Sequence, residues 1–456
     1  MPGISDQIAL VLNSYIYEDD SMKILFYRYG SICEPDIISA FKNAGYDVSE
    51  YGLEITEKEH TAAELVPLFS QYLMDHPCDI IFSINFFPFV SEIAKIMHVP
   101  YVSWTVDSPV MELYTSSITN PYNFTFIFDR ADADELAPLN PGHIFHLPLA
   151  TNVKDKDAVI SRYVNYCKNK GFSTADFSLS ETSGHKVPDS DKSIEASIAA
   201  GFEHANSPKY YSHDITFIGS LYTEKSPYDK LPDDAPAYMR GYLDALMRSQ
   251  LLVYGDNFLE KALKDDVVEA FASAHPSFYR PQSDEQRKYL TDRMTLSRLY
   301  LGNKIAAMER TSFLKALSDF YPKDTAIFTG SDTSEMPHIK NMGLAKSLTE
   351  MPYIFRTSKI NLNFTSKSIR TGLPLRIFDI LGSSGFCLTN YQSELTDIFT
   401  PGEHLDFYGS REDLLEKCRY YLDHEAERKE ITAAGYEEIK KKHTWDIRVQ
   451  ELFNMI

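Results

Sequence analysis

Short apolar runs alternate with amphipathic segments along most of the chain, and this alternation predicts the strands and helices of an α/β protein. The runs DIIFSI (residues 79–84) and YVSWTV (residues 101–106) are apolar on both faces. A parallel sheet that is covered by helices on both sides requires such strands. Residues 124–128 and 143–149 predict two further strands. The first part of the chain is therefore expected to form a Rossmann-like domain.

The alternation starts again near residue 214, which predicts a second Rossmann-like domain. DITFIGSLY (residues 214–222) contains an apolar strand followed by Gly219 and Ser220, a composition that suits a loop facing a phosphate. Residues 237–318 show mainly helical periodicity and are expected to form a helical insertion. TAIFTG (residues 325–330) then resumes the sheet.

A polar segment between about residues 161 and 207 separates the two patterns and is interpreted as a surface excursion or an interdomain segment. We therefore expect an N-terminal domain over residues 1–205, with a polar linker at its end. A C-terminal domain that carries the insertion is expected over residues 206–442. The predicted fold class is α/β with two Rossmann-like domains.

The stretch from residue 358 to residue 397 is the most informative part of the chain. It predicts a strand, a basic loop with Lys367 and Arg370, a Gly-Leu-Pro turn that begins at Gly372, a short helix and a second strand. A strand, a loop and a helix N-terminus in this order can hold a phosphate through backbone N–H groups and the helix dipole. The expected strands and helix cover residues 359–364, 386–389 and 375–381.

The basic residues of this stretch predict a site for a nucleotide diphosphate. Lys367, Arg370 and Arg376 surround the turn, and positive groups placed there stabilise the charge that grows on a diphosphate leaving group. The alternative is a solvated basic loop. Asp379 follows Arg376 by one helical turn, where its carboxylate could accept the hydroxyls of a ribose or form an ion pair with Arg376.

Two loops of the N-terminal domain are further candidates. Asp107 ends a strand in VDSP, where a carboxylate could act as the general base for an acceptor hydroxyl. Alternatively, Asp107 or Ser108 caps the segment that follows. Gly30 and Ser31 lie at a strand-to-helix junction, which suits either close approach to a ligand or a plain tight turn.

Composition and motifs exclude several other functions. The chain of 456 residues has a net charge of -20, which argues against non-specific binding to nucleic acid or to anionic lipid. Its five cysteines are scattered, and no His, Cys and carboxylate cluster has metal-ligand spacing. Asp132 and Asp134 form an Asp-x-Asp pair that is interpreted as the start of a helix. No Walker A loop, GxGxxG or GxSxG motif occurs, and we expect a soluble, cytoplasmic protein without a transmembrane segment.

The C-terminal third of the chain resembles a known family. The stretch SKINLNFTSKSIRTGLPLRIFDILGSSGFCLTNYQSEL and the tail FTPGEHLDFYGSREDLLEKCRYYLDHEAERKEITAAGYEEIKKKHTWDIRVQEL resemble the C-terminal domain of CgeB-like glycosyltransferases, within the broad GT-B group. YVSWTVDSP and DITFIGSLY are similar to the N-domain and domain-junction sequences of that group. The resemblance covers about half of the chain and leaves out the helical insertion and the polar linker.

The resemblance implies a donor site in the C-terminal domain, an acceptor site mostly against the N-terminal domain, and a last helix over residues 443–456 that crosses back to the first domain. Such enzymes need no bound metal or other cofactor besides the nucleotide sugar. Arg370 and Arg376 would lie near the diphosphate, Asp379 near the ribose, and Gly219 with Ser220 beside the phosphates.

One residue departs from the family pattern. Many retaining GT-B enzymes carry a pair of glutamates, of which the second matches Asp379 and the first falls on Thr371. Glu394, just beyond the second strand, is a candidate for a polar contact to the donor in its place. The departure leaves open whether the reaction retains or inverts the sugar configuration.

Three functions remain open at this point. The first is a glycosyltransferase that moves a hexose or an N-acetylhexosamine from a UDP-linked or similar donor to a protein, glycan or surface polymer. The second is a binding or scaffold protein of a spore or cell surface that has the same fold and no turnover. The third is a phosphosugar enzyme on this fold, such as an epimerase. The oligomeric state cannot be deduced.

Overall fold

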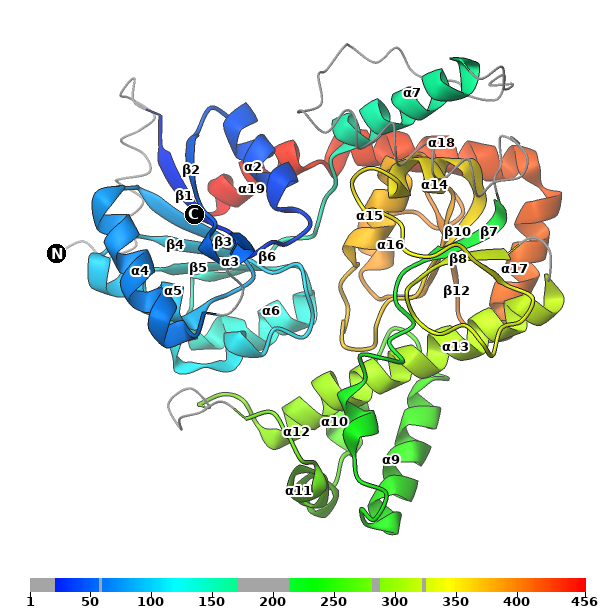
Figure 1. The fold of residues 1–456 in the computed structure, drawn as a ribbon, viewed down its shortest axis with the longest axis horizontal. Coiled ribbons are helices and arrows are strands. Elements are labelled where there is room, and N and C mark those ends of the chain that lie inside the picture. The colour runs from blue at the N-terminus through cyan, green and yellow to red at the C-terminus, as the bar shows by residue number, and fades with distance from the viewer. Residues whose placement is uncertain (1–20, 57–59, 170–212, 281–287, 322–324) are drawn as a thin grey trace.

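Two parallel six-stranded sheets organise the chain, each in a domain of its own (Figure 1). The computed structural model describes residues 21–56, 60–169, 213–280, 288–321 and 325–456. Helices cover both faces of each sheet, as expected from strands that are apolar on both sides. The predicted fold class, α/β with two Rossmann-like domains and a helical insertion in the second, is confirmed.

The N-terminal sheet has the strand order β2-β1-β3-β4-β5-β6. Side chains alternate along β1, so that Ile24 and Phe26 pack on the face covered by α2 and α19, while Leu25 and Tyr27 pack with α4 and α5 on the other face. The strands are β1 (Lys23–Tyr27), β2 (Asp47–Tyr51), β3 (Ile80–Ile84), β4 (Tyr101–Trp104), β5 (Asn123–Ile127) and β6 (Ile144–His146). The helices are α2 (Glu34–Asn43), α3 (Leu53–Thr56), α4 (Ala62–Asp75), α5 (Pro88–Met97), α6 (Arg130–Leu136) and the short turns η1 (Met111–Tyr114), η2 (Ser116–Thr119) and η3 (Ala137–Leu139).

The C-terminal sheet has the order β12-β11-β10-β7-β8-β9. The stretch 358–397 forms the expected strand, loop, helix and strand, with bounds shifted by one residue at most ends. The strands are β7 (His213–Ile218), β8 (Thr325–Phe328), β9 (Lys340–Asn341), β10 (Ser358–Asn363), β11 (Cys387–Asn390) and β12 (Asp406–Tyr408). The helices are α13 (Gly302–Phe320), α14 (Met351–Thr357), α15 (Leu375–Gly382), α16 (Leu395–Ile398), α17 (Arg411–Asp423) and α18 (Glu425–Lys442).

The helical insertion has a small core of its own and extends away from the C-terminal sheet (Figure 1). Met239, Phe271 and Tyr300 are among its fully buried side chains. Helix α13 starts in this core with Ile305 and continues into the core of the C-terminal domain with Leu314, so it connects the two. The insertion consists of η4 (Pro227–Lys230), α9 (Ala237–Gln250), α10 (Leu259–Ala262), α11 (Asp265–Ala274), α12 (Asp292–Met294) and η5 (Thr295–Leu301).

Two segments cross between the domains. After β6 the chain enters α7 (Val153–Asn169), which lies over the C-terminal domain against α14 (Figure 1). The rings of Tyr163 and Tyr353 stack there at 4.6 Å, which holds α7 on the C-terminal side although its residues were assigned to the N-terminal domain. The domain boundary at residue 205 lies outside the described residues and stays a prediction.

The second crossing leads back from α18 to α19 (Trp445–Met455), which packs against α2 of the N-terminal domain. Where the two crossings meet, the N–H of Thr151 donates to the carbonyl oxygen of His443 at 3.1 Å, and the N–H of Trp445 donates to that of Thr151 at 3.4 Å. These two segments form the hinge of the molecule, which we define as residues 150–152 and 443–445.

Candidate functional site

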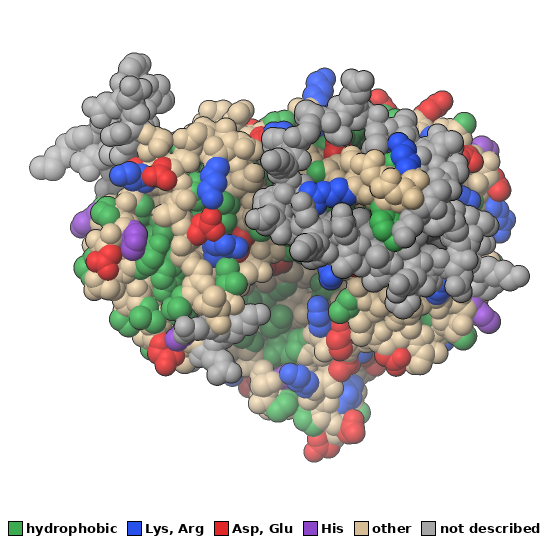
Figure 2. Space-filling view, turned by 45° about the horizontal axis from the view of Figure 1, so that its top comes forward, with side chains coloured by type: hydrophobic (Ala, Val, Ile, Leu, Met, Phe, Trp, Pro, Cys, Tyr) green, Lys and Arg blue, Asp and Glu red, His purple; other side chains and the backbone are tan. Residues whose placement is uncertain are grey.

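The candidate site lies between the domains, where loops from the carboxyl ends of both sheets meet. The space-filling view shows a hollow between the N-terminal domain, the C-terminal domain and the helical insertion, with Lys and Arg side chains at its rim (Figure 2). Ligands of open α/β sheets bind where strand order reverses, because the loops diverge there and leave a crevice. The strand order reverses beside β1 in the first sheet and beside β7 in the second.

On the N-terminal side, Asn85 organises the loops after β3 and β4. Its backbone has a positive φ of 57°, a conformation that Asn tolerates better than most residues. The Asn85 Nδ2 donates to Asp107 Oδ2 at 2.7 Å and to the Tyr29 hydroxyl at 2.8 Å, while its Oδ1 accepts from the Val106 N–H at 3.0 Å. Asp107 is exposed and held by this amide, so its carboxylate faces solvent at the strand tip.

The backbone N–H groups of the loop after β1 are bound by the carboxylate of Glu34. Glu34 is fully buried, and its Oε1 accepts from the backbone N–H groups of Tyr29, Gly30 and Ser31 at 2.9, 2.9 and 3.0 Å. Three N–H groups on one oxygen satisfy the donors that a ligand would otherwise use. Of the two interpretations of Gly30 and Ser31, the structure favours the tight turn.

On the C-terminal side, Arg310 of α13 spans the point where the strand order reverses. Its guanidinium donates to the carbonyl oxygens of Ser220, after β7, and of Phe364, after β10, both at 2.6 Å. Its guanidinium carbon also lies 4.4 Å from the ring centroid of Tyr222. Sequence reasoning missed Arg310, since helical periodicity alone assigned it to the insertion and gave no sign of which loop it reaches.

Arg376, on the first turn of α15, lies near Arg310. Burial lowers the pKa of Arg376, Asp379 opposes this, and the charge of Arg310 lowers it further. Burial likewise lowers the pKa of Arg310. Within the described residues, neither arginine forms an ion pair with a carboxylate, and Arg376 donates only to the sulfur of Met351, at 2.8 Å. Both arginines are partly buried, and the charges of Glu309 and Glu224 near Arg310 and of Asp379 near Arg376 oppose the lowering of the pKa. Two guanidinium groups without a carboxylate ion pair, one of them at the start of α15, favour an anionic ligand.

Gly219 and Ser220 form the turn that directly follows β7, and Arg310 contacts this turn. The Ser220 hydroxyl donates to Glu224 Oε1 at 2.8 Å. Burial would raise the pKa of Glu224, but hydrogen bonds from its own backbone N–H and from Ser220 and Ser331 lower it to about 2. The predicted contact of this turn with phosphates stays a prediction.

Lys367 points into the protein. Its Nζ lies 3.8 Å from the centroid of the Tyr254 ring and 3.9 Å from Glu309 Oε1. Burial lowers the pKa of Lys367, and the nearby Glu309 opposes this. The ammonium group is thus held by residues of the insertion and of α13, and the structure does not bring it to Arg376.

Arg370 reaches across to the N-terminal domain. Its Nη1 donates to Asp132 Oδ1 at 3.1 Å and to a carboxylate oxygen of Glu135. Burial and the charge of Asp129 raise the pKa of Asp132 to about 7, although Arg298 and Arg370 oppose this. Arg370 therefore has carboxylate partners, in contrast to Arg376, and its predicted place at the diphosphate remains untested.

Thr371, Gly372 and Glu394 also lie at the domain contact. The Thr371 hydroxyl donates to Asp129 Oδ1 at 2.8 Å, and a Cβ added at Gly372 would lie 2.9 Å from the carbonyl oxygen of Phe128. Glu394 Oε2 lies 2.8 Å from His146 Nε2. These contacts hold the loops after β10 and β11 against the N-terminal domain, and donor contacts of the three residues stay predictions.

Asp379 lies at the hinge. Its Oδ1 accepts from the Thr151 hydroxyl at 2.9 Å and lies 2.9 Å from Lys156 Nζ. The expected local ion pair with Arg376 is not formed within the described residues, although the two charges interact. Asp379 lies on the same short helix as Arg376, and its predicted contact with a ribose stays a prediction.

The Asp132 and Asp134 pair begins helix α6, as interpreted from the sequence. Asp129 is the N-cap, and its Oδ1 accepts from the N–H of Ala131 at 3.0 Å. Among the described residues, no group of three or more His, Cys, Asp or Glu side chains could hold a metal ion. No helix in the described part of the chain is long and apolar enough to cross a membrane.

The C-terminal part of the chain is similar to a known protein family. Residues 310–454 match the family described as glycosyl transferase-like, and the matched region begins at Arg310. It contains the α15 helix and both strands of the stretch 358–397. No curated protein sequence matches the chain.

Solved structures similar to this chain share about a tenth of its sequence. A glycosyltransferase from Rickettsia africae has 10% identity and a TM-score of 0.46, with 95% of this chain and 97% of that chain covered. Anabaena Alr3699/HepE, in complex with UDP and glucose, has 10% identity and a TM-score of 0.44, with 95% and 98% covered. Sucrose-phosphate synthase from Thermosynechococcus elongatus has 10% identity and a TM-score of 0.49, with 94% and 97% covered.

Proposed function

We propose that the protein is a glycosyltransferase that moves a hexose or an N-acetylhexosamine from a UDP-linked sugar to a protein, glycan or surface polymer. We place it, within the GT-B group, with the CgeB-like enzymes. The observation that carries the proposal is the pair Arg310 and Arg376, which lack carboxylate partners among the described residues and lie where strand order reverses. The glycosyl transferase-like match over residues 310–454 includes both arginines.

The two arginines would stabilise the leaving group. As the bond between the sugar and the diphosphate breaks, negative charge grows on the diphosphate oxygens. Guanidinium groups make bidentate contacts to phosphate, and in a partly buried site water screens these contacts less. We propose that Arg310 and Arg376, together with the N–H groups at the start of α15, supply the positive charge that stabilises the diphosphate, and that no metal ion is required.

Residues on both sides of the hollow would complete the site. Asp379 would accept hydroxyl groups of the ribose, and Asp107 would take the proton of the acceptor hydroxyl as the new bond forms. The amide of Asn85 donates to Asp107 and keeps its carboxylate oriented. The donor would thus lie against the C-terminal domain and the acceptor against the N-terminal domain.

Calorimetric titration with UDP tests the donor site directly. Arg376→Ala should weaken UDP binding at least tenfold, because a charge-assisted hydrogen bond contributes about 1.5–3 kcal/mol. Arg411→Ala is the matched control, since Arg411 lies on the same domain in an exposed pair with Glu412 at 2.9 Å. Equal affinity of the two variants for UDP would refute the placement of Arg376 at the diphosphate.

Turnover separates the enzyme from a non-catalytic protein of the same fold. The wild-type protein should release UDP slowly from UDP-glucose or from UDP-N-acetylglucosamine without an added acceptor, and an enzyme-coupled assay measures that release. Binding of UDP without any release from either sugar, or from sugars of other nucleotides, would favour the binding or scaffold protein. A sugar converted to its epimer would instead identify an epimerase.

A further inference from the structure

Lys156 of α7 is a buried lysine that the proposed reaction does not use. Its side chain is 11% exposed, and its Nζ lies 2.9 Å from Oδ1 of Asp379, so this ion pair connects α7 with α15. Burial alone would lower the pKa of Lys156, but the carboxylates of Asp379, Asp36 and Asp155 raise it above its ordinary value. Lys156 is therefore a permanently charged partner of the carboxylate proposed to bind the ribose.

Both protein donors use the same oxygen of Asp379. The Thr151 hydroxyl and the Lys156 ammonium group lie 2.9 Å from Oδ1, whereas Oδ2 accepts no hydrogen bond from the described residues. A carboxylate fixed through one oxygen cannot rotate freely, and its second oxygen keeps its lone pairs for another donor. The hydroxyl groups of a ribose are donors of the required kind.

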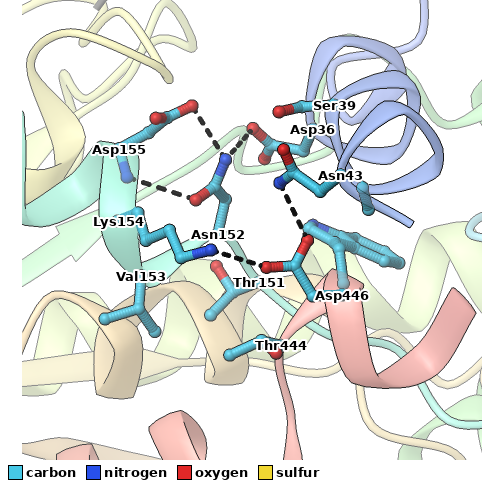
Figure 3. Close-up of a pocket in the computed structure, with 12 residues that line it drawn as sticks. Asp36, Ser39, Asn43, Thr151, Asn152, Val153, Lys154, Asp155, Thr444 and Asp446 are labelled. Carbon is cyan, nitrogen blue, oxygen red and sulfur yellow. Dashed lines mark hydrogen bonds and ion pairs between the residues drawn. The ribbon is translucent and has the colours of Figure 1, made fainter. Parts of the chain in front are cut away.

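The surroundings explain why the lysine is needed. Asp36 on α2 and Asp155 on α7 lie on either side of Asn152, whose Nδ2 donates to both at 3.2 and 2.8 Å (Figure 3). Burial, opposed by Lys156 and Asn152, raises the pKa of Asp36 to about 6. Lys156 interacts favourably with all three carboxylates and so offsets their mutual repulsion around Asp379.

We propose that Lys156 is a positioning residue that holds Oδ1 of Asp379, so that Oδ2 stays directed at the hydroxyl groups of the donor's ribose. Thr151, at the hinge, has the same function through its hydroxyl group. The proposal rests on the function proposed above and adds that recognition of the ribose depends on a lysine from the crossing helix α7.

The test compares ribose with 2′-deoxyribose. Wild-type protein should bind UDP about tenfold or more tightly than 2′-deoxy-UDP, the effect expected for one hydrogen bond to a charged group. In Lys156→Met this preference should fall to about threefold or less, because only the Thr151 hydroxyl then holds the carboxylate. Titration calorimetry of each variant with both nucleotides measures the preference.

Lys154→Met is the matched control. Lys154 lies on the same helix, and its Nζ is 2.9 Å from Asp446 Oδ2 in an exposed pair (Figure 3). This variant should keep the full preference for UDP. If Lys156→Met does not fold, Thr151→Val provides the test, since valine removes the hydroxyl group and keeps the shape of the side chain. This variant should lower the preference for UDP over 2′-deoxy-UDP from about tenfold to about threefold.

A different result is expected if Lys156 only stabilises the fold and does not orient Asp379. Loss of folding stability alone would weaken UDP and 2′-deoxy-UDP equally and leave their ratio unchanged, which would overturn the inference. The double variant of Lys156→Met and Asp379→Asn should show the same preference as Asp379→Asn alone, and additive losses would also overturn it. If the wild-type protein binds no nucleotide at all, the proposed function fails instead, so the two failures are distinguishable.

Discussion

Replacing Arg298 by alanine should loosen the contact between the helical insertion and the N-terminal domain. Arg298 lies in η5, and its side chain is only 6% exposed. It donates to both oxygens of Glu135 at 3.0 and 2.9 Å and to Glu260 Oε2 at 3.0 Å. Glu135 belongs to helix α6 and Glu260 to the insertion, so one guanidinium joins segments that are distant in sequence.

The cost of the substitution can be worked out from these contacts. Breaking a buried ion pair typically costs about 3–5 kcal/mol, because the remaining charges lose their partner. Glu135 and Glu260 are 32% and 36% exposed, so water screens part of this loss. Arg370 also stays beside Glu135. We therefore expect Arg298→Ala to reduce the free energy of unfolding by about 2–3 kcal/mol.

Thermal unfolding followed by circular dichroism measures the effect. A loss of this size corresponds to a fall in Tm of roughly 4–12 °C for a domain of about 150–250 residues. Arg280→Ala is the control, because Arg280 donates to Asp292 Oδ1 at 3.0 Å within the same insertion, but 44% and 38% of the two side chains are exposed. The control should lose less than about 1 kcal/mol. Equal losses for the two variants would refute the linking role of Arg298.

Three further substitutions test other parts of the molecule. The pKa of Asp132 rises to about 7 in the folded protein through burial and the charge of Asp129, whereas an unfolded Asp releases its proton near pH 4. Stability should therefore fall as pH rises from about 4 to 7, and Asp132→Asn should flatten the Tm profile across that window; an unchanged slope would contradict the shift. Asp107→Asn should lower transfer by about a hundredfold or more and spare UDP affinity, and an unaltered rate in a transfer assay would remove it as the base. Gly382→Ala should destabilise by about 1–3 kcal/mol in urea unfolding, because its Cβ would lie 2.5 Å from the Thr151 side chain, whereas Gly241→Ala, with nothing within 4 Å, should be neutral or stabilising.

Local patterns in the sequence determined the secondary structure of the candidate site. Apolar runs on both faces predicted the strands, and the observed β10 (Ser358–Asn363) and β11 (Cys387–Asn390) begin within one residue of the expected positions. The turn at Gly372 to Pro374 predicted the start of the helix that carries Arg376 and Asp379. These features depend on residues close together in the chain, so periodicity and turn chemistry suffice to predict them.

The partners of the charged side chains were decided by the tertiary structure. Lys367, Arg370 and Arg376 lie within ten residues of each other, and all three were predicted to surround one phosphate-binding turn. In the fold, Lys367 turns toward Glu309 and Arg370 toward Glu135, and only Arg376 is left without a carboxylate partner among the described residues.

The contacts of Arg310 likewise could not be predicted from the sequence. It belongs to a helix that the sequence assigned to an insertion, yet it reaches the ends of β7 and β10. Asp379 similarly finds its partner Lys156 on a helix more than 200 residues earlier. Hydrophobic periodicity predicts which face of a helix or strand is buried. It does not predict which distant segments the long polar side chains contact, because that depends on how the elements pack. The sequence therefore determined the strands and helices of the candidate site, while the packing of distant elements decided which charged side chains are paired with one another.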